Sequence, residues 1–269
     1  MKVLTINKGI TIKKLELEAS SILLRGAGMD KSVLSNGDGG YDLMPDGRKR
    51  GTFRSYTAFI SGQDVTVKDL TIENTAGDGR VHGQAVALYA DAERFTCKRV
   101  HLKGHQDTLF LSPLPVKERE PDGFKGPRQK APRIPTIQYY EDCLIEGDID
   151  FIFGGADAIF RNCEIRSLFR PPLESDDNRQ IRYTHDGVPI QGFVCAPCTP
   201  EGGRGFEFIN CLFTTDCCPD GSVYLARPWR PYGKAVFKSC SFGAHIAPER
   251  FAGWANPLQV ESTADFLIL

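Results

Sequence analysis

The chain has 269 residues, of which 41% are hydrophobic, so it can bury a substantial core, and we expect one elongated domain over residues 1–269. Its formal net charge of -1 and isoelectric point of about 6.5 leave no basic surface for nucleic acid. No apolar run of 18 residues occurs, which argues against a membrane span.

The first nine residues alternate in polarity as a strand does. They lack the apolar core and the small-residue cleavage site of a signal peptide. The chain as written is therefore expected to stay in the cytoplasm, and to be secreted only if a leader has been trimmed from it. We expect a monomer, although no motif bears on assembly.

A short pattern recurs along the chain: an apolar residue, two polar residues, a small apolar residue, a polar residue and another apolar residue. Six copies begin at Val67, Cys97, Tyr140, Phe160, Phe208 and Phe237, and residues 12–17 resemble a seventh. The copies are 30, 43, 20, 48 and 29 residues apart, which is typical of solenoid coils whose strands are fixed and whose loops vary on one side. No long amphipathic helix is indicated. We therefore predict an all-β, single-stranded right-handed parallel β-helix.

Two long segments between the copies are predicted to be irregular insertions. Residues 112–136 contain six prolines among charged residues, and residues 167–191 contain Pro171, Pro172 and a run of short polar side chains. Both are expected to project near the turn that bears Asp107 and Asp150, where they would wall a cleft.

The nine cysteines do not suggest a disulfide framework, because four of them share one position of the repeat: Cys143, Cys163, Cys211 and Cys240. This placement predicts buried free thiols. Cys195 and Cys198 form an isolated Cys-x-x-Cys pair, and a zinc site would need further ligands at suitable spacing. We therefore interpret these two, and residues 217–218, as loop cysteines.

Asp107 and Asp150 occupy equivalent places in two repeats. Each lies seven residues after the small apolar residue of its copy, Val100 in one and Cys143 in the other. Stacked parallel strands lie about 4.8 Å apart, so the two carboxylates are expected to be neighbours. Because two carboxylates held this close cannot both ionise easily, one is expected to be protonated near neutral pH. One aspartate can then act as nucleophile and the other as general acid.

Three further side chains suit the same chemistry. The guanidinium of Arg227 can hold one aspartate ionised through a bidentate contact, and the amides of Gln84 and Gln106 can donate to an oxyanion. A serine nucleophile is unsupported, because no Gly-x-Ser-x-Gly motif occurs. Taken singly, these residues would more often be structural, as turn aspartates bond the local backbone and aromatic residues such as Phe151 and Phe153 fill cores.

Taken together, four blocks resemble the signature blocks of the pectin methylesterases, in the same order. They are residues 83–88 (GQAVAL), 104–109 (GHQDTL), 150–154 (DFIFG) and 225–229 (LARPW). The similarity extends from about residue 21 to residue 254. It implies a right-handed parallel β-helix that uses no metal or other cofactor and removes methyl groups from galacturonate esters of pectin or oligogalacturonides.

The resemblance also implies a role for each candidate. Asp150 is the implied nucleophile that forms an acyl-enzyme, and Asp107 the acid that protonates the departing methanol and then activates water. Arg227 is implied to orient Asp150, and Gln84 and Gln106 to stabilise the oxyanion. The residues implied to contact the sugar are Trp229, Phe151, Phe153, Phe110 and His105.

Four positions depart from the usual family pattern. Tyr is usual where His105 and Phe110 stand, Asn where Gly155 stands, and Gly where Ala226 stands. None of these changes removes a catalytic atom, but two of them alter expected substrate contacts. The insertion at residues 112–136 is also unusual and is expected to narrow the cleft toward short oligogalacturonides.

Two other functions remain open at this point. One is a related β-helix protein that acts on a different ester or only binds acidic saccharides. The other is an eliminating enzyme similar to the pectate lyases, which would need a calcium-binding cluster of carboxylates on one face. Sensitivity to a chelator would separate a lyase from an esterase.

Overall fold

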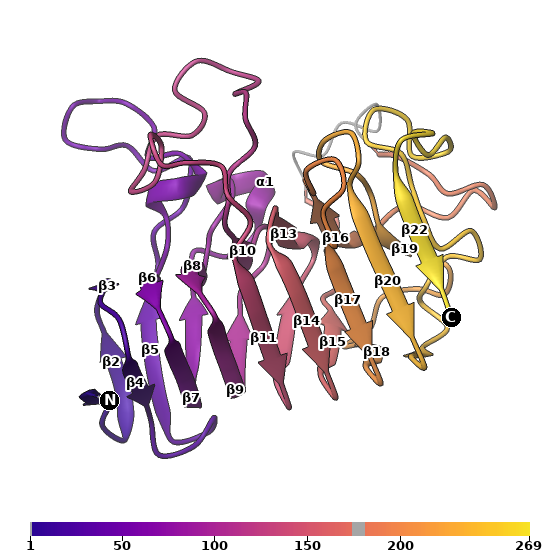
Figure 1. Ribbon diagram of the computed structural model, residues 1–269. Coiled ribbons are helices and arrows are strands. Elements are labelled where there is room, and N and C mark those ends of the chain that lie inside the picture. The colour runs from indigo at the N-terminus through magenta and orange to yellow at the C-terminus, as the bar shows by residue number, and fades with distance from the viewer. Residues whose placement is uncertain (1, 174–180) are drawn as a thin grey trace.

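The chain winds as coils of parallel strands that stack into two long sheets (Figure 1). The computed structural model describes residues 2–173 and 181–269. Within these residues every pairing between named strands is parallel. The predicted all-β parallel β-helix is therefore confirmed.

The smaller sheet has seven strands. In spatial order they are β3 (Leu15–Glu18), β6 (Ala58–Gln63), β8 (Leu88–Glu93), β10 (Leu109–Leu111), β13 (Ile149–Gly154), β16 (Gly192–Pro197) and β19 (Val223–Ala226). One face of this sheet packs into the interior core and the other lies under the long loops.

The larger sheet has fifteen strands and contains all six copies of the sequence repeat. Its N-terminal strands are β1 (Lys2–Thr5), β2 (Gly9–Ile12), β4 (Ile22–Arg25), β5 (Ser32–Asn36), β7 (Val65–Asn74) and β9 (Phe95–Lys103). The others are β11 (Ile137–Glu141), β12 (Leu144–Gly147), β14 (Asp157–Arg161), β15 (Glu164–Ser167), β17 (Phe206–Ile209), β18 (Leu212–Thr215), β20 (Lys234–Lys238), β21 (Ser241–Phe242) and β22 (Asp265–Ile268).

The repeat marks a bend, which lies within β7 and β9 in the first two copies and between two short strands in the later ones. The third residue of every copy has a φ between 50° and 59°, in the left-handed region: Asp69, Arg99, Asp142, Asn162, Asn210 and Ser239. Asp and Asn adopt this conformation more readily than other residues with a side chain, which explains why they recur there. The first residues of the six copies pair in register from coil to coil, so the copies are structurally equivalent.

The prediction that residues 12–17 form a seventh copy of the repeat is wrong. Ile12 in β2 pairs with Ser35 in the larger sheet, whereas Leu15 in β3 pairs with Ala58 in the smaller sheet. The residue that pairs with Val67, the start of the first secure copy, is Leu24. Residues 12–17 therefore run from the larger sheet to the smaller one. The segment that is equivalent to the repeat begins at Leu24 and is interrupted by the turn between β4 and β5.

The core of the C-terminal half is built from stacked rings. Tyr140 and Phe160 lie 4.7 Å apart between ring centroids, Phe160 and Phe208 4.6 Å, and Phe208 and Phe237 4.9 Å, with interplanar angles of 16°, 11° and 4°. All four come from the first position of the repeat. Equivalent residues of successive coils lie one strand spacing apart, which brings these rings close enough to stack face to face.

The cysteines of the repeat form a second ladder beside the rings. Each thiol donates to a backbone carbonyl in the preceding coil: Cys163 to Tyr140, Cys211 to Phe160 and Cys240 to Phe208, each at 3.5 Å. All nine cysteines are free, and Cys143, Cys163 and Cys211 are buried as predicted, while Cys240 is half-buried.

The interpretation of Cys195 as a loop cysteine is wrong, because it lies within strand β16 and is fully buried. Cys198, just after that strand, is buried as well. Of the adjacent pair, Cys217 is exposed and Cys218 is buried.

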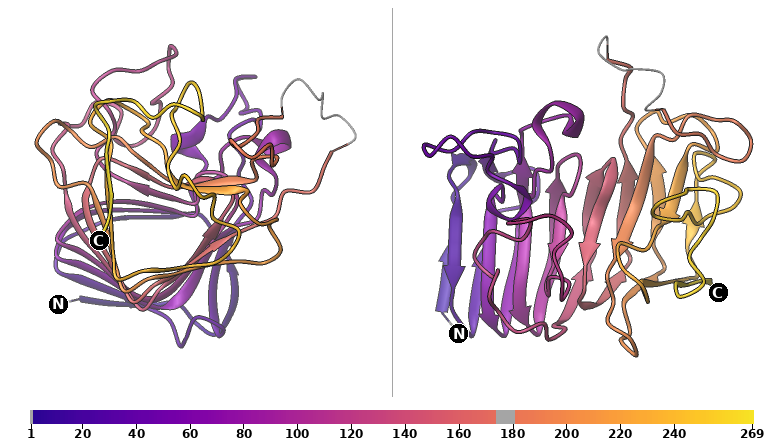
Figure 2. Two further views of the ribbon diagram at one scale, coloured as in Figure 1. Left: turned by 90° about the vertical axis from the view of Figure 1, so that its right-hand side faces the viewer. Right: turned by 90° about the horizontal axis from the view of Figure 1, so that it is seen from above.

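The long connections gather on one side of the coils (Figures 1 and 2). Residues 112–136 run from β10 to β11 without a helix or strand, and the side chain of Phe124 within them is buried. Arg133 ties this insertion together by donating to the carbonyls of four residues, Pro115, Arg128, Gln129 and Ala131. Of the segment 167–191, residues 174–180 lie outside the described residues, and Tyr183 forms an antiparallel bridge with Pro189.

Helix is sparse in the described ranges and consists of the 3-10 turn η1 (Thr52–Arg54) and the single turn α1 (Gly79–His82). No helix in this part of the chain is long and apolar enough to span a membrane.

We expect the ring stack to carry much of the stability of the C-terminal coils. Phe208→Ala should lower the free energy of unfolding by about 3 to 5 kcal/mol, because it opens a cavity between two stacked rings. Leu212→Ala in the same coil is the control, because Leu212 is 49% exposed, and it should cost less than about 1 kcal/mol. Urea unfolding measures both, and equal losses would contradict this account of the core.

Candidate active site

An aromatic ladder crosses the loop-covered face of the smaller sheet. The in-register residues of β6, β8, β10, β13 and β16 are Phe59, Tyr89, Phe110, Phe153 and Ala196. The ring centroids of Tyr89 and Phe110 lie 4.7 Å apart, and those of Phe110 and Phe153 lie 5.0 Å apart. The ladder ends at Ala196, whose methyl group fills far less space than a ring, and a cavity opens beside it.

The cavity has a volume of about 300 Å³, at the small end of the range for small-molecule sites. Its polar wall contains the five predicted catalytic side chains: Gln84, Gln106, Asp107, Asp150 and Arg227. Its aromatic wall contains Phe53, Phe124, Phe153, Trp229 and Trp254. Arg119, Glu120 and Arg230 lie at the same cavity, the first two within the insertion.

Asp107 and Asp150 reach the cavity from equivalent turns of adjacent coils. Their φ angles are 68° and 50°, and the amide of Asp107 donates to the carbonyl of Ile149 at 3.0 Å. Both residues are almost fully buried, with 8% and 6% of their surface exposed. A left-handed backbone at two buried acids is the kind of strain that is concentrated at functional sites.

A bulge in β13 decides which side chain of that strand faces the cavity. Strict alternation from Phe153, which lines the cavity, would put Phe151 on the same face and Asp150 in the interior. The pairing of β13 with β16 instead shifts register between Ile149 and Ile152, where Asp150 has its positive φ. As a result Asp150 faces the cavity, and Phe151 packs fully buried in the interior core.

Arg227 holds the carboxylate of Asp150 in a bidentate ion pair. Its Nε donates to Oδ1 at 2.8 Å and its Nη2 donates to Oδ2 at 2.6 Å. The guanidinium also lies over two rings, 3.8 Å from the centroid of Phe193 and 4.5 Å from that of Trp254. These planar contacts make the pair rigid and hold a positive charge against the carboxylate of Asp150.

Asp107 has no such bidentate contact within the described residues. Burial raises the pKa of the Asp107 carboxyl well above its usual value, the charge of Asp150 raises it further, and Arg227 opposes both. The raised pKa favours the protonated form of Asp107, next to the carboxylate that Arg227 binds.

The side-chain amides of Gln84 and Gln106 line the cavity beside the two aspartates. Their backbones lie on adjacent coils, since the amide of Ala85 donates to the carbonyl of Gln106 at 3.1 Å. Neither side-chain amide forms a hydrogen bond to another residue in the described ranges, so their N–H groups are open to a bound ligand.

The predicted sugar contacts divide into three groups. Trp229 and Phe153 do line the cavity. Phe110 is fully buried beneath Phe53 and Phe153, so it supports the cavity floor and cannot touch a ligand. The burial of Phe151 likewise contradicts its expected sugar contact.

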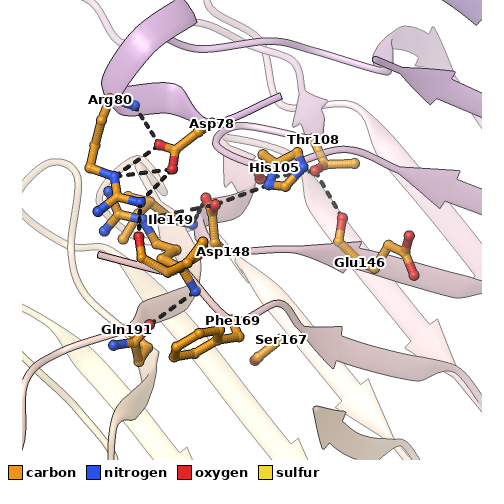
Figure 3. Close-up of polar contacts among 12 residues, drawn as sticks. Asp78, Arg80, His105, Thr108, Glu146, Asp148, Ile149, Ser167, Phe169 and Gln191 are labelled. Carbon is orange, nitrogen blue, oxygen red and sulfur yellow. Dashed lines mark hydrogen bonds and ion pairs between the residues drawn. The ribbon is translucent and has the colours of Figure 1, made fainter. Parts of the chain in front are cut away.

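His105 lies outside the cavity wall and bridges the turns that carry Asp107 and Asp150 (Figure 3). Its Nδ1 lies 3.3 Å from Oδ2 of Asp148, which can only accept, so this nitrogen carries the hydrogen. Asp148 is 1% exposed and also accepts from the amide of Ile149 at 2.6 Å. The hydrogen bond to Asp148 raises the pKa of His105. The structure thus shows a structural contact of His105, and its expected sugar contact stays a prediction, because the side chain is 36% exposed.

Thr108 links the same turns at a second point. Its hydroxyl lies 2.9 Å from the carbonyl of Glu146 and 3.1 Å from that of His105 (Figure 3). Together with the His105 and Asp148 pair, this contact fixes the turn of Asp107 against the turn of Asp150.

Sequence reasoning did not single out nine of the residues that line the cavity, among them the large side chains of Phe53, Arg119, Phe124, Arg230 and Trp254. The insertion was expected to wall the cleft, but no residue pattern marked Arg119 or Phe124 within it. No group of three or more His, Cys, Asp or Glu side chains that could hold a metal ion occurs within residues 2–173 and 181–269.

A family model described as Pectinesterase matches residues 1–114 and 134–264 of the chain. The probable pectinesterase/pectinesterase inhibitor 36 of Arabidopsis thaliana is 31% identical over 262 residues, which are 94% of this chain and 42% of that protein. The pectinesterase/pectinesterase inhibitor PPE8B of Prunus persica is 29% identical over 264 residues, covering 96% of this chain and 42% of that protein. The chain thus spans less than half the length of these curated relatives.

Among solved structures, the pectin methylesterase PemA from Erwinia chrysanthemi superposes with a TM-score of 0.72 at 25% identity, over 98% of this chain and 83% of that one. A pectin methylesterase in complex with a hexasaccharide gives the same values. The pectin methylesterase from Yersinia enterocolitica shares the fold, with a TM-score of 0.73 at 24% identity, over 98% of this chain and 88% of that one. The family match spans most of the sequence, and the chain belongs to the pectinesterase family.

Proposed function

We propose that the chain is a carbohydrate esterase that hydrolyses methyl esters of galacturonate in pectin or oligogalacturonides and releases methanol. The observation that carries the proposal is the bidentate ion pair of Arg227 with one of two adjacent buried aspartates, Asp150, and the raised pKa of the other, Asp107, supports it. This arrangement supplies a nucleophile and an acid at one cavity without a metal ion.

In the first half of the reaction, the ionised carboxylate of Asp150 attacks the ester carbonyl carbon. The carbonyl oxygen gains the negative charge of the tetrahedral intermediate, and the side-chain amides of Gln84 and Gln106 donate to it. As the intermediate collapses, the bond to the methoxy oxygen breaks and Asp107 gives its proton to that oxygen. Methanol leaves, and the sugar acyl group remains on Asp150 as an anhydride.

In the second half, Asp107 is a carboxylate and acts as base. It takes a proton from water while the water oxygen attacks the acyl carbon. The second tetrahedral intermediate collapses to the sugar carboxylic acid, which loses its proton to solvent, and the carboxylate of Asp150 is restored against Arg227. Asp107 keeps the proton and is ready for the next ester.

The proposed substrate agrees with the shape of the site and with the relatives. A hexasaccharide is bound in one structure of a pectin methylesterase that resembles this chain. In this chain the rings of Phe153 and Trp229 meet edge to face, with centroids 5.7 Å apart, and offer an apolar wall for a sugar ring.

Removal of either aspartate should abolish methanol release. Asp150→Asn should lower kcat by at least about a thousandfold because it removes the nucleophile, and Asp107→Asn by about a hundredfold or more because it removes the acid and base. The assay is methanol release from methyl-esterified oligogalacturonides with EDTA present.

Asp142→Asn is the matched control for both variants, because Asp142 is another turn aspartate with a positive φ, outside the cavity. It should retain the parent rate. No release from the folded parent chain would point to a different ester or to a binding role.

The raised pKa of Asp107 predicts two opposite effects of pH. Since the first step needs protonated Asp107, kcat/KM should fall as pH rises through this raised pKa. Because the pKa of Asp107 is raised in the folded chain, protonation of Asp107 stabilises the fold. This stabilisation is fully present below pH 3.8, the ordinary pKa of the group, and is lost as pH rises through the raised pKa. Asp107→Asn should therefore gain stability relative to the parent as pH increases. Urea unfolding along a pH series tests this, and a constant difference would show that Asp107 is not protonated in the folded chain.

The oxyanion role predicts a loss confined to the chemical step. Gln106→Ala should lower kcat by about a hundredfold with little change in KM, because the donor acts on charge that develops in the transition state. Gln63→Ala, at an exposed position at the end of β6, should leave both constants unchanged. A rise in KM alone would instead assign Gln106 to substrate binding.

A further inference from the structure

The insertion adds a cation to the cavity from outside the part of the chain that matches the family model. That model leaves residues 115–133 unmatched, and Arg119 lies among them. Its side chain nevertheless lines the cavity that contains Asp107 and Asp150. Arg119 is therefore a feature of this chain rather than of the family pattern.

Contacts with the two tryptophans hold Arg119 in place. Its Nη2 donates to the backbone carbonyl of Trp229 at 2.8 Å, and its guanidinium lies 4.7 Å from the centroid of the Trp254 ring. The same indole ring lies 4.5 Å from the guanidinium of Arg227. Arg119 and the arginine that binds Asp150 thus share one aromatic ring.

Arg230 joins Arg119 at the same wall. Its Nη1 donates to the carbonyl of Trp229 at 2.9 Å and its Nη2 to the carbonyl of Lys117 in the insertion at 3.2 Å. Its guanidinium lies 4.8 Å from the centroid of the Trp229 ring. Two guanidinium groups therefore converge on one backbone carbonyl at the edge of the cavity.

Neither of these arginines has a carboxylate partner within the described residues, in contrast to Arg227, which is paired with Asp150. Burial lowers the pKa of both Arg119 and Arg230, and each also feels a neighbouring guanidinium. Glu120 on the cavity wall is exposed and makes no ion pair within the described ranges, and the charge of Glu261 also acts on Arg119. With Asp150 paired to Arg227, the guanidinium groups of Arg119 and Arg230 are left at this wall without an ion pair among the described residues.

We propose that Arg119 and Arg230 bind the free carboxylate of a galacturonate unit that neighbours the esterified one, so that the preferred substrate is a partially demethylated galacturonan or oligogalacturonide. This inference rests on the proposed function. A guanidinium fork matches the two oxygens of a carboxylate and cannot form an ion pair with a neutral methyl ester. A fully esterified substrate would cover both cations without supplying a counter-charge, which costs free energy.

The kinetic test compares partially and fully methyl-esterified oligogalacturonides. The parent should have a higher kcat/KM for the partially esterified substrate, and Arg119→Gln should lower the ratio of the two values by about tenfold. Arg230→Gln should act in the same direction. Lys130→Gln, which removes the same charge from an exposed position of the insertion outside the cavity, should leave the ratio unchanged. An unchanged ratio in both arginine variants overturns the inference.

A binding test keeps this inference separate from the proposed function. Oligogalacturonate without methyl esters has no bond to hydrolyse, so its affinity is measured by calorimetry on the parent chain and on Arg119→Gln. We expect about tenfold weaker binding to the variant, with the difference shrinking as salt is added. If the parent releases no methanol but Arg119→Gln binds oligogalacturonate more weakly than the parent does, the proposed function fails and the carboxylate site stands. Equal affinity for the two chains overturns the carboxylate site, whatever the esterase activity.

Discussion

The site depends on one constraint, the register in which each coil stacks on the next. Parallel strands in register bring equivalent residues of successive coils to adjacent positions, whatever those residues are. In the core this stacks the rings of Phe160 and Phe208. At the edge of the smaller sheet the same rule puts Asp107 beside Asp150, where the two acids resist joint ionisation. The fold thus holds two acidic groups close together, and the proposed chemistry depends on this proximity.

Arg227 forms an ion pair with one of these two acids, Asp150. Its bidentate contact holds a positive charge against Asp150, whereas burial and the neighbouring carboxylate raise the pKa of Asp107. The guanidinium is itself held by its stacking on Phe193 and Trp254, and the two catalytic turns are tied by His105, Asp148 and Thr108 (Figure 3). The acid and the nucleophile of the proposed mechanism would then be in position before a substrate binds, which would reduce the reorganisation that the reaction requires.

The long loops add the features that the repeat does not supply. The stacked sheet offers an aromatic floor that stops at Ala196, and residues 112–136 close the cavity above it with Phe124 and Arg119. Because a surface loop tolerates insertion without disturbing the strands beneath it, the wall of the site can change while the catalytic turns stay fixed. The proposed carboxylate site draws on both parts of the molecule. Arg119 belongs to the insertion, and Arg230 follows β19, the strand that ends at Ala226.

The sequence by itself determined the repeat, the all-β class and the equivalence of Asp107 and Asp150, because these depend on spacing along the chain. It could not place Phe151, since a bulge in β13 reverses the alternation that spacing assumes. It misassigned residues 12–17 because their pattern spans two sheets. Trp254 and Arg119 reach the cavity from irregular loops with no period to follow. Only the tertiary structure decided which of these side chains meet, because their contacts join distant segments whose positions depend on how the coils stack.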